Sequence, residues 1–407
     1  MAISVEKVFE EISNITHQLD FEIIPIENAQ NRISASALYA TSELPRFNNS
    51  AMDGYAIVYE NKDEELEIID TIFAGDDNTN LVKPNTCIKI MTGARIPENA
   101  TAIIPKEDTQ KLNDNKIKII KNVKEFQHIR FIGEDIKKNE LLLNKGDLVN
   151  FSKVTLLASQ GISHIKVYKK PNIVVFASGE ELKLHYEKAQ AHQIYNSNTP
   201  TFISRAQELG CEVTFIGQAK DTIESIKELI QNSLNADLII TSGGVSVGDA
   251  DFTKAAFNEL DFKTIFDGII IKPGKPTVFG KIGKTFILNL PGNPLASALI
   301  FEMFGKNIVQ KLQGSNEIFH NFIETKLSDD LFNKKGRITV VPGNFDGTKF
   351  EVAQKRSPGM VSVLSSCNSM IVLDENVEKL QKDALVKILP IDWKFFTKEK
   401  KDFLTYE

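Results

Sequence analysis

The sequence predicts a multidomain α/β plus β protein whose centre is an αβα domain with a parallel sheet. Three observations carry this prediction: strand-like and helix-like segments alternate in the middle of the chain, short strands dominate on either side, and glycine turns directly follow strands. At 407 residues the chain is too long for one ordinary core, so several domains are expected. A composition of 42% hydrophobic and 25% charged residues is that of a globular protein.

Residues 170–312 carry the alternation, which is typical of parallel strands with helices on both faces of the sheet. The expected strands are Ile173–Ala177, Glu212–Ile216, Ala236–Ile240, Ile269–Ile271 and Thr285–Leu290, and the expected helices are Thr201–Leu209, Thr222–Leu234, Thr253–Leu260 and Pro294–Gln310.

Residues 1–40 together with 138–169 are expected to form a helical N-terminal part. Ser4–Leu19 has the apolar spacing of an amphipathic helix, with Ser4 as its N-cap. The helical pattern continues over Arg32–Tyr39 and resumes at Ser152–Gln160.

Two β-rich domains complete the predicted organisation. Residues 41–137 form an inserted β-rich domain, and residues 315–395 form a small C-terminal β-barrel-like domain. The expected strands are Gly54–Tyr59, Glu67–Ile72, Thr86–Met91, Ala102–Pro105 and Lys116–Lys121 in the insert, and Arg337–Val341, Phe350–Ala353, Ser369–Leu373 and Leu385–Leu389 in the C-terminal domain.

The bulk properties exclude several classes of function. A net charge of −6 argues against non-specific nucleic-acid binding, which needs a basic face. The three cysteines form no Cys-x-x-Cys pair, so a zinc site or a disulfide framework is not expected. No apolar run approaches the roughly 20 residues of a membrane helix, and we expect a cytoplasmic protein that binds no membrane and no nucleic acid.

Three glycine turns within the alternating region follow apolar runs, and each carries polar or charged residues. Glycine lets backbone N–H groups approach an oxyanion closely, and lysines and aspartates add fixed charge. This pattern predicts a site for a phosphate-bearing anion with a divalent cation at the sheet's carboxyl edge. The turns are Thr241-Ser-Gly-Gly-Val-Ser-Val-Gly-Asp-Ala-Asp251, Lys272-Pro-Gly-Lys-Pro276 and Leu290-Pro-Gly-Asn-Pro294.

The first turn also contains a Gly-x-Ser-x-Gly pattern around Ser246, which is typical of a hydrolase nucleophile. Such a hydrolase needs a later histidine, and His320, the one candidate, lies in no recognisable catalytic segment. We therefore favour a role in which Ser242 and Ser246 donate hydroxyl groups to an anion. The chain has no P-loop, no Gly-x-Gly-x-x-Gly and no His-Glu-x-x-His motif.

Carboxylates recur where strands end. Glu181, Asp221, Asp249 and Asp251 all follow predicted strands, and such oxygen ligands suit Mg²⁺ bound to a substrate phosphate. For Asp221, a simple role as an acid in the first turn of a helix is an equally good explanation. In the insert, Asp53, Thr92 and Asp135 lie in polar turns, each of which alone is better explained by turn formation than by function.

Eight segments in this order resemble the molybdopterin molybdenumtransferase family, also known as the MoeA and gephyrin E-domain family, from about residue 3 to about residue 390. Besides the three glycine turns, they are Ser50-Ala-Met-Asp-Gly-Tyr-Ala56, Met91-Thr-Gly93, Gly133-Glu-Asp-Ile136, Ser178-Gly-Glu-Glu-Leu182 and Asn196-Ser-Asn198.

The resemblance implies insertion of molybdate into adenylated molybdopterin, with release of AMP, by a Mg²⁺-dependent homodimer. Contacts with the molybdopterin adenylyltransferase and with molybdoenzyme chaperones are also implied. The implied catalytic residues are Asp53, Thr92, Asp135, Glu181, Asp221 and Asp251, of which Glu181, Asp221 and Asp251 hold the metal. The implied nucleotide and pterin contacts are Ser242, Gly243, Gly244, Ser246, Asp249, Pro291, Asn293 and Pro294, and the implied molybdate contacts are Lys272, Lys275, Arg337 and Ser357.

Two alternatives from other classes stay open at this point. One is a non-catalytic scaffold protein on the same fold. The other is a molybdopterin adenylyltransferase-like enzyme, since such enzymes share the Gly-Gly-Val-Ser type of turn. The second alternative would leave residues 1–168 and 315–407 unexplained.

Overall fold

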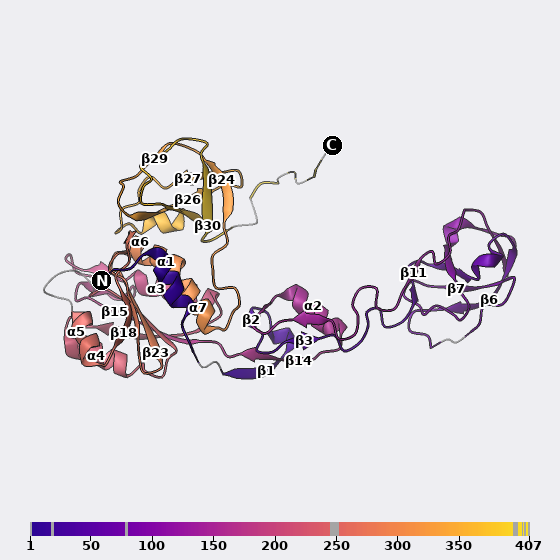
Figure 1. Ribbon diagram of the computed structural model, residues 1–407, viewed down its shortest axis with the longest axis horizontal. Coiled ribbons are helices and arrows are strands. Elements are labelled where there is room, and N and C mark those ends of the chain that lie inside the picture. Colours follow the sequence, from indigo (N-terminus) through magenta and orange to yellow (C-terminus); the bar gives the residue numbers. More distant parts are fainter. Residues whose placement is uncertain are drawn as a thin grey trace.

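The computed structural model describes residues 2–17, 20–77, 80–244, 252–393, 398–400, 402 and 404–405. The molecule is elongated (Figure 1). An αβα part and the C-terminal strands lie together at one end, a thin middle part extends from them, and a separate β-rich part lies at the far end. We call that last part, built on residues 49–130, the distal module.

The central sheet has six strands, and its four neighbouring strands β18, β15, β19 and β23 are parallel as predicted. Strand β22 pairs antiparallel with β23 and with β20 at the edge, so the sheet is mixed; the sequence pattern did not reveal β20 or β22. The bounds are β15 Asn172–Ser178, β18 Glu212–Ala219, β19 Leu238–Ser242, β20 Lys263–Asp267, β22 Val278–Ile282 and β23 Thr285–Leu290.

Successive side chains of these strands enter two cores on opposite faces of the sheet, as strand geometry requires. In β15, Ile173 and Val175 belong to one core, and Val174 and Phe176 belong to the other. Helices α3, α6, α7 and α1 cover the first face, and α4 and α5 cover the second. Their bounds are α1 Val5–Ser13, α3 Asn198–Glu208, α4 Ile223–Gln231, α5 Phe252–Glu259, α6 Pro294–Ile300 and α7 Lys306–Leu312.

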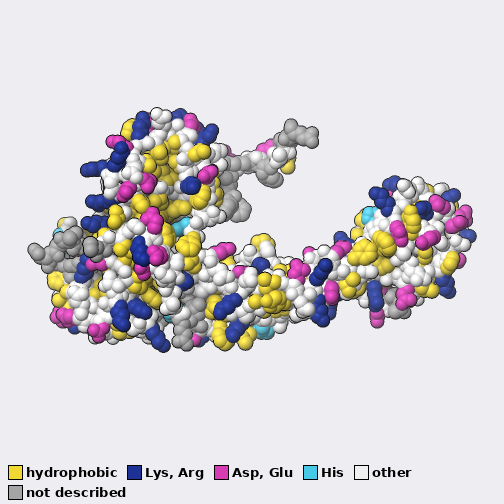
Figure 2. All heavy atoms as spheres, in the orientation of Figure 1, with side chains coloured by type: hydrophobic (Ala, Val, Ile, Leu, Met, Phe, Trp, Pro, Cys, Tyr) yellow, Lys and Arg dark blue, Asp and Glu magenta, His cyan; other side chains and the backbone are white. Residues whose placement is uncertain are grey.

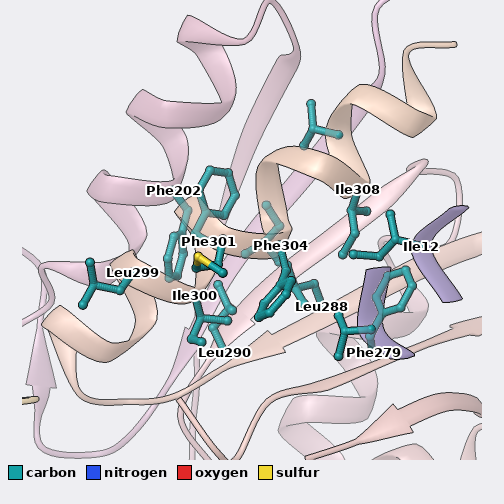
Figure 3. Packing of buried hydrophobic residues seen from close by; sticks show 14 of the residues in the cluster. Ile12, Phe202, Phe279, Leu288, Leu290, Leu299, Ile300, Phe301, Phe304 and Ile308 are labelled. Atoms are coloured by element: carbon teal, nitrogen blue, oxygen red, sulfur yellow. The ribbon is translucent and has the colours of Figure 1, made fainter. Parts of the chain in front are cut away.

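The first core is the larger one and is rich in aromatic side chains. Figure 3 shows Phe202 of α3 beside Phe301 and Phe304, with Leu288 and Leu290 of β23 below them. The two phenylalanines of the last helix lie in a five-residue π-helix, Phe301–Gly305, that joins α6 to α7. The long helix predicted from Pro294 is therefore confirmed, with one wide turn inside it.

Helix α1 packs in this core, although we expected it to form a domain with residues 138–169. Its Val8 and Ile12 are buried among the side chains of the αβα part, and the Ser4 hydroxyl caps the helix by accepting from the Lys7 N–H at 3.2 Å. The helix ends at Ser13, which is earlier than the apolar pattern suggested.

The C-terminal strands close into a small barrel, as predicted. The sheet order is β26-β27-β24-β30-β28, and β28 pairs back with β26. The bounds are β24 Ile323–Leu327, β25 Leu331–Phe332, β26 Ile338–Phe345, β27 Lys349–Val352, β28 Ser369–Leu373, β29 Lys379–Leu380 and β30 Leu385–Pro390.

One short strand ties the αβα part to the barrel. Strand β21 (Ile271–Lys272) was expected in the central sheet, but it pairs in parallel with β26. The expectation for Ile269–Ile271 was therefore wrong as to the sheet, because an apolar run of three residues carries no information about its partner. The glycine turn Lys272–Pro276 therefore begins on a strand that pairs with the barrel.

The middle part contains one helix and several two-stranded pairs. The helix predicted over Arg32–Tyr39 is wrong, because strands form there that pair with residues more than 100 positions away. Tertiary pairing overrides a weak local pattern in such a segment. The bounds are β1 Phe21–Pro25 with β14 His164–Tyr168, β2 Arg32–Ile33 with β13 Leu148–Val149, β3 Leu38–Tyr39 with β12 Leu141–Leu143, and α2 Phe151–Ser159.

The distal module is a six-stranded sheet in the order β8-β5-β7-β6-β10-β9, with small apolar cores packed on it. The strands expected in the insert are confirmed. The bounds are β4 Asn49–Ser50, β5 Gly54–Ile57, β6 Glu65–Ile72, β7 Thr86–Ile90, β8 Ala102–Pro105, β9 Thr109–Lys111, β10 Lys116–Ile119 and β11 Ile129–Arg130.

Candidate functional site

The order of the central strands creates a crevice between β15 and β19. After β15 the chain forms β18 on one side, and it then passes through α4 to form β19 on the other side. The loops that follow β15 and β19 therefore diverge at the carboxyl edge of the sheet, which is where open α/β sheets bind ligands. None of the helices in the described ranges is long and apolar enough to cross a membrane.

A pocket of about 720 Å³ occupies this crevice. It is bounded by the loops after β15, β19 and β23, by the start of α3 and by a loop of the barrel. The described lining residues are Ser178, Gly179, Glu181, Leu182, Ile194, Tyr195, Asn196, Ser197, Asn198, Asp221, Ser242, Gly243, Gly244, Pro276, Pro291, Gly292, Asn293, Pro294, Gly359 and Val361.

The first glycine turn forms the floor of the pocket, and its backbone requires glycine. Gly243 has a φ of +97°, and a Cβ there would lie 2.8 Å from the Ser178 carbonyl oxygen. Gly244 has a φ of +64°, and a Cβ there would lie 2.1 Å from the Thr253 Oγ1. The turn therefore presents bare backbone to the pocket. The remaining predicted residues of this turn, Ser246, Asp249 and Asp251, lie outside the described residues.

The side chain of Asn198 joins the first glycine turn to the third. Its Nδ2 donates to the Gly292 carbonyl at 2.8 Å and lies 3.3 Å from the Ser242 Oγ. The Asn198 side chain is buried, and the residue starts helix α3. The sequence analysis assigned Asn198 no role, although the segment Asn196-Ser-Asn198 before a predicted helix could have indicated one.

The third glycine turn and a barrel loop meet at the opposite wall. The backbone N–H groups of Leu295 and Ala296, at the start of α6, donate to the Pro358 carbonyl at 3.0 and 3.3 Å. This contact fixes the loop that contributes Gly359 and Val361 to the pocket. The predicted nucleotide and pterin contacts Pro291, Asn293 and Pro294 all line the pocket. The predicted molybdate contact Ser357 is exposed and directly precedes Pro358, whose carbonyl accepts these two bonds.

Two of the three predicted metal ligands lie in the pocket. Glu181 and Asp221 both line it, and the Asp221 Oδ2 accepts from the Glu180 N–H at 3.2 Å. Neither carboxylate forms an ion pair with another described residue, so both keep oxygens free for a cation. Within the described part of the chain, no group of three or more His, Cys, Asp and Glu side chains could hold a metal ion.

The predicted molybdate contacts lie at the junction with the barrel. Lys272 is the cross-strand partner of Thr339, and Arg337 lies directly before β26, two residues from Thr339. Lys272 and Lys275 are exposed and form no ion pair within the described residues. Pro276, which follows this turn, lines the pocket. Figure 2 shows basic side chains gathered along the left side of the barrel.

The predicted residues of the insert are split between two places. Asp53 and Thr92 meet in the distal module, where the Thr92 N–H and hydroxyl donate to the Asp53 Oδ1 at 2.8 and 2.9 Å. These bonds, the backbone bond first, hold the pKa of Asp53 below its ordinary value of 3.8. Asp135 lies in the connection to the middle part, where its N–H donates to the Leu44 carbonyl at 3.0 Å.

Within one chain the distal pair cannot join the pocket. The distal module lies at the far end of the elongated molecule from the αβα part (Figure 1). The structure therefore brings together the predicted nucleotide contacts with Glu181 and Asp221, and it separates them from Asp53 and Thr92.

Three family models match the chain in succession. Residues 3–161 match "MoeA N-terminal region (domain I and II)", residues 174–311 match "Probable molybdopterin binding domain", and residues 324–391 match "MoeA C-terminal region (domain IV)". The central match coincides with the sheet whose switch point forms the pocket. Fold and site thus define a multidomain protein with a pterin-binding type of αβα domain.

The chain belongs to the molybdopterin molybdenumtransferase family. It is 37% identical over 312 residues to the molybdopterin molybdenumtransferase of Haemophilus influenzae, which covers 75% of this chain and 77% of that protein. A Staphylococcus epidermidis protein of the same name is 29% identical over 420 residues, covering 98% and 97% of the two chains. A crystal structure of a MoeA protein from Pyrococcus horikoshii superposes with a TM-score of 0.82 at 28% identity, covering 97% of this chain and 100% of that one.

Proposed function

We propose that this protein inserts molybdate into adenylated molybdopterin, releasing AMP and forming molybdenum cofactor. Family membership over almost the whole chain supports the proposal. The observation that carries it is the pocket at the switch point, which is lined by a bare glycine turn, by the carboxylates of Glu181 and Asp221, and by Pro276 of the lysine-bearing turn. No contact in the structure favours the adenylyltransferase or the scaffold alternative.

The pocket floor would hold the phosphate-bearing end of the substrate. Its bare glycine backbone allows N–H groups and an anion to approach each other closely. Asn198 fixes the distance between the first and third glycine turns, so the floor is formed before the ligand arrives. Preformed polar groups stabilise developing charge without a cost of reorganisation at the moment of reaction.

Molybdate, the second substrate, would bind at the junction with the barrel. It is a small dianion, and Lys272, Lys275 and Arg337 together supply more than enough positive charge to neutralise it. The exposed Ser357 adds a hydroxyl donor from the adjacent barrel loop. Because the two lysines have no competing ion pair among the described residues, no internal partner must be displaced when the oxyanion binds.

The donor set of the pocket also fits Mg²⁺. This ion is usually held by one or two carboxylates together with waters and substrate phosphates. Glu181 and Asp221 provide such a pair, with Asp251 as the third predicted ligand. When bound, Mg²⁺ would neutralise phosphate charge. Asp221 is oriented for this by the bond that it accepts from the Glu180 N–H.

We further propose that the protein acts as a homodimer with composite active sites. Asp53 and Thr92 form an exposed, ionised and hydrogen-bonded pair that lies far from the pocket of its own chain. In a symmetric dimer, such a pair can complete the pocket of the other copy. Asp135 would lie on the connection that carries the distal module to that position.

An assay of AMP release tests the proposed reaction. The purified protein is mixed with adenylated molybdopterin, molybdate and Mg²⁺, and AMP is quantified over time. We expect AMP release that requires both molybdate and protein. Absence of release would contradict the proposal, and ATP-dependent adenylation of free molybdopterin would instead support the adenylyltransferase alternative.

A further inference from the structure

An aromatic and an aliphatic side chain stand exposed at the rim of a mostly polar pocket. Ile194 and Tyr195, which form strand β17 (Ile194–Tyr195), are 59% and 52% exposed although both line the pocket. Tyr195 is the one aromatic residue among the described residues of the lining. Large apolar side chains that stay exposed within a ligand site mark the place where a flat or apolar part of the ligand is covered.

The backbone holds this pair beside the predicted metal ligands. Strand β17 pairs in parallel with β16 (Leu182–Lys183). The Ile194 N–H donates to the Glu181 carbonyl at 2.9 Å, and the Asn196 N–H donates to the Lys183 carbonyl at 2.8 Å. The apolar rim is therefore fixed directly next to one of the two pocket carboxylates.

The ring of Tyr195 is also held from the other side. Its hydroxyl accepts from the Ala189 N–H at 3.4 Å, across the loop that separates β16 from β17. That loop is closed by two local bonds, from the Leu184 N–H to the Glu187 Oε2 and from the Gln190 N–H to the Gln193 Oε1. This bond holds the end of the side chain at the loop, and the ring face is the part of Tyr195 that we expect a ligand to cover.

We propose that the ring of Tyr195 is the stacking surface for a fused nitrogen heterocycle of the substrate. The inference rests on the proposed function, because adenylated molybdopterin carries two such rings, the adenine and the pterin. The glycine turn and the carboxylates take the charged groups, and the rim covers a ring attached to them. Aromatic side chains bind bases in this way without reading hydrogen-bonding edges.

The test compares three variants in equilibrium binding with two separate probes, AMP and molybdopterin. Tyr195→Ala removes the ring, and Tyr195→Phe keeps the ring without its hydroxyl. Tyr186→Ala is the matched control, because Tyr186 lies on the same loop, is 73% exposed and is not among the lining residues. Both positions are at the surface, so unchanged circular dichroism and melting temperature confirm folding.

We expect Tyr195→Ala to weaken binding of at least one probe by about 5- to 140-fold, which corresponds to the stacking of one base on an aromatic side chain. Tyr195→Phe and Tyr186→Ala should stay within about twofold of the parent protein, since both keep the Tyr195 ring face. The probe that loses affinity identifies the ring: AMP for the adenine, molybdopterin for the pterin.

Three results would overturn the inference while leaving the proposed function intact. They are unchanged affinity for both probes in Tyr195→Ala, an equal loss in Tyr195→Phe, and an equal loss in Tyr186→Ala. The second would assign the effect to the hydroxyl, and the third to the loop as a whole. A parent protein that binds neither probe and releases no AMP would overturn the proposed function and the inference together.

Discussion

The floor of the pocket and the predicted catalytic pair of the distal module are held in opposite physical settings. At the pocket end, Asn198 and Ser242 are buried and locked to each other and to neighbouring turns. At the distal end, Asp53 and Thr92 are exposed, and their side chains are held mainly by one another. The pocket floor is thus held by bonds within one chain, whereas the distal pair is exposed at the surface of its own module.

The difference follows from how each end is built. The pocket arises from a parallel sheet, whose topology necessarily leaves a crevice at the switch point. The distal module is a six-stranded sheet, and its predicted pair, Asp53 and Thr92, lies in turns that follow β4 and β7. We place the distal pair against a second copy of the chain because it is exposed and lies far from the pocket of its own chain.

The largest effect is expected from Gly243→Ala in the pocket floor. The added Cβ would meet the Ser178 carbonyl at 2.8 Å, so the turn must shift and AMP binding should be lost. Gly217→Ala is the matched control, because Gly217 also has a positive φ, of +106°, but nothing within 4 Å of the new Cβ. Both variants should be destabilised by about 1–3 kcal/mol from backbone strain.

Calorimetric titration with AMP separates the two variants. Retained affinity in Gly217→Ala together with lost affinity in Gly243→Ala would support a preformed floor that needs bare backbone. Parental affinity in Gly243→Ala would show that the floor adapts, and it would weaken the contrast between the two ends.

A smaller effect is expected from Lys272→Ala at the barrel junction. Loss of one charge-assisted contact should raise the KM for molybdate by roughly 10- to 150-fold, as expected for a hydrogen bond to a charged group. Lys284→Ala is the control, because Lys284 lies on an exposed turn directly before β23, whereas the third glycine turn lies after this strand. This substitution should leave the KM for molybdate unchanged. Equal KM values for Lys272→Ala and the parent protein would remove Lys272 from the molybdate site.

The smallest effect concerns the ionisation of Asp53. Thr92→Val removes the hydroxyl donor but keeps the backbone donor, so the lowered pKa of Asp53 should rise only part of the way towards 3.8. NMR titration of the carboxyl carbon measures this shift. Asp346 of the barrel, whose pKa is lowered by its own turn, should titrate unchanged and serves as the control in the same spectrum.

The sign of the pH effect on folding follows from this lowered pKa. The stabilisation by ionised Asp53 is present above the ordinary value of 3.8 and is lost as the pH falls through the lower folded-state pKa. Near neutral pH, the parent protein and Thr92→Val should therefore have the same charge at this position. A pKa of Asp53 that is identical in both proteins would show that the hydroxyl bond has no effect on ionisation.

Sequence patterning predicted the pocket well because its signals are local. A strand followed by a glycine turn is visible in the residues themselves, and Gly243 and Gly244 adopt positive φ as such a turn requires. The same holds for the capped helix that starts after Ser4. These features depend on backbone constraints that act within a few residues.

Features that depend on distant partners could not be predicted in the same way. Strand β21 pairs with the barrel, and the strands that replace the expected helix at Arg32–Tyr39 exist only through pairing across the middle part. No role was predicted for Tyr195, because its strand β17 has two residues and its place at the pocket depends on pairing with β16.

A mixing experiment tests the central claim that the two ends act together across a dimer. Asp53→Ala and Asp221→Asn chains are produced separately, and each is expected to be nearly inactive in AMP release. After co-expression in equal amounts, half of the dimers are mixed and each mixed dimer has one intact composite site, so about a quarter of the parental activity should return. Activity of the mixture no higher than that of the separate variants would contradict a site shared between two chains.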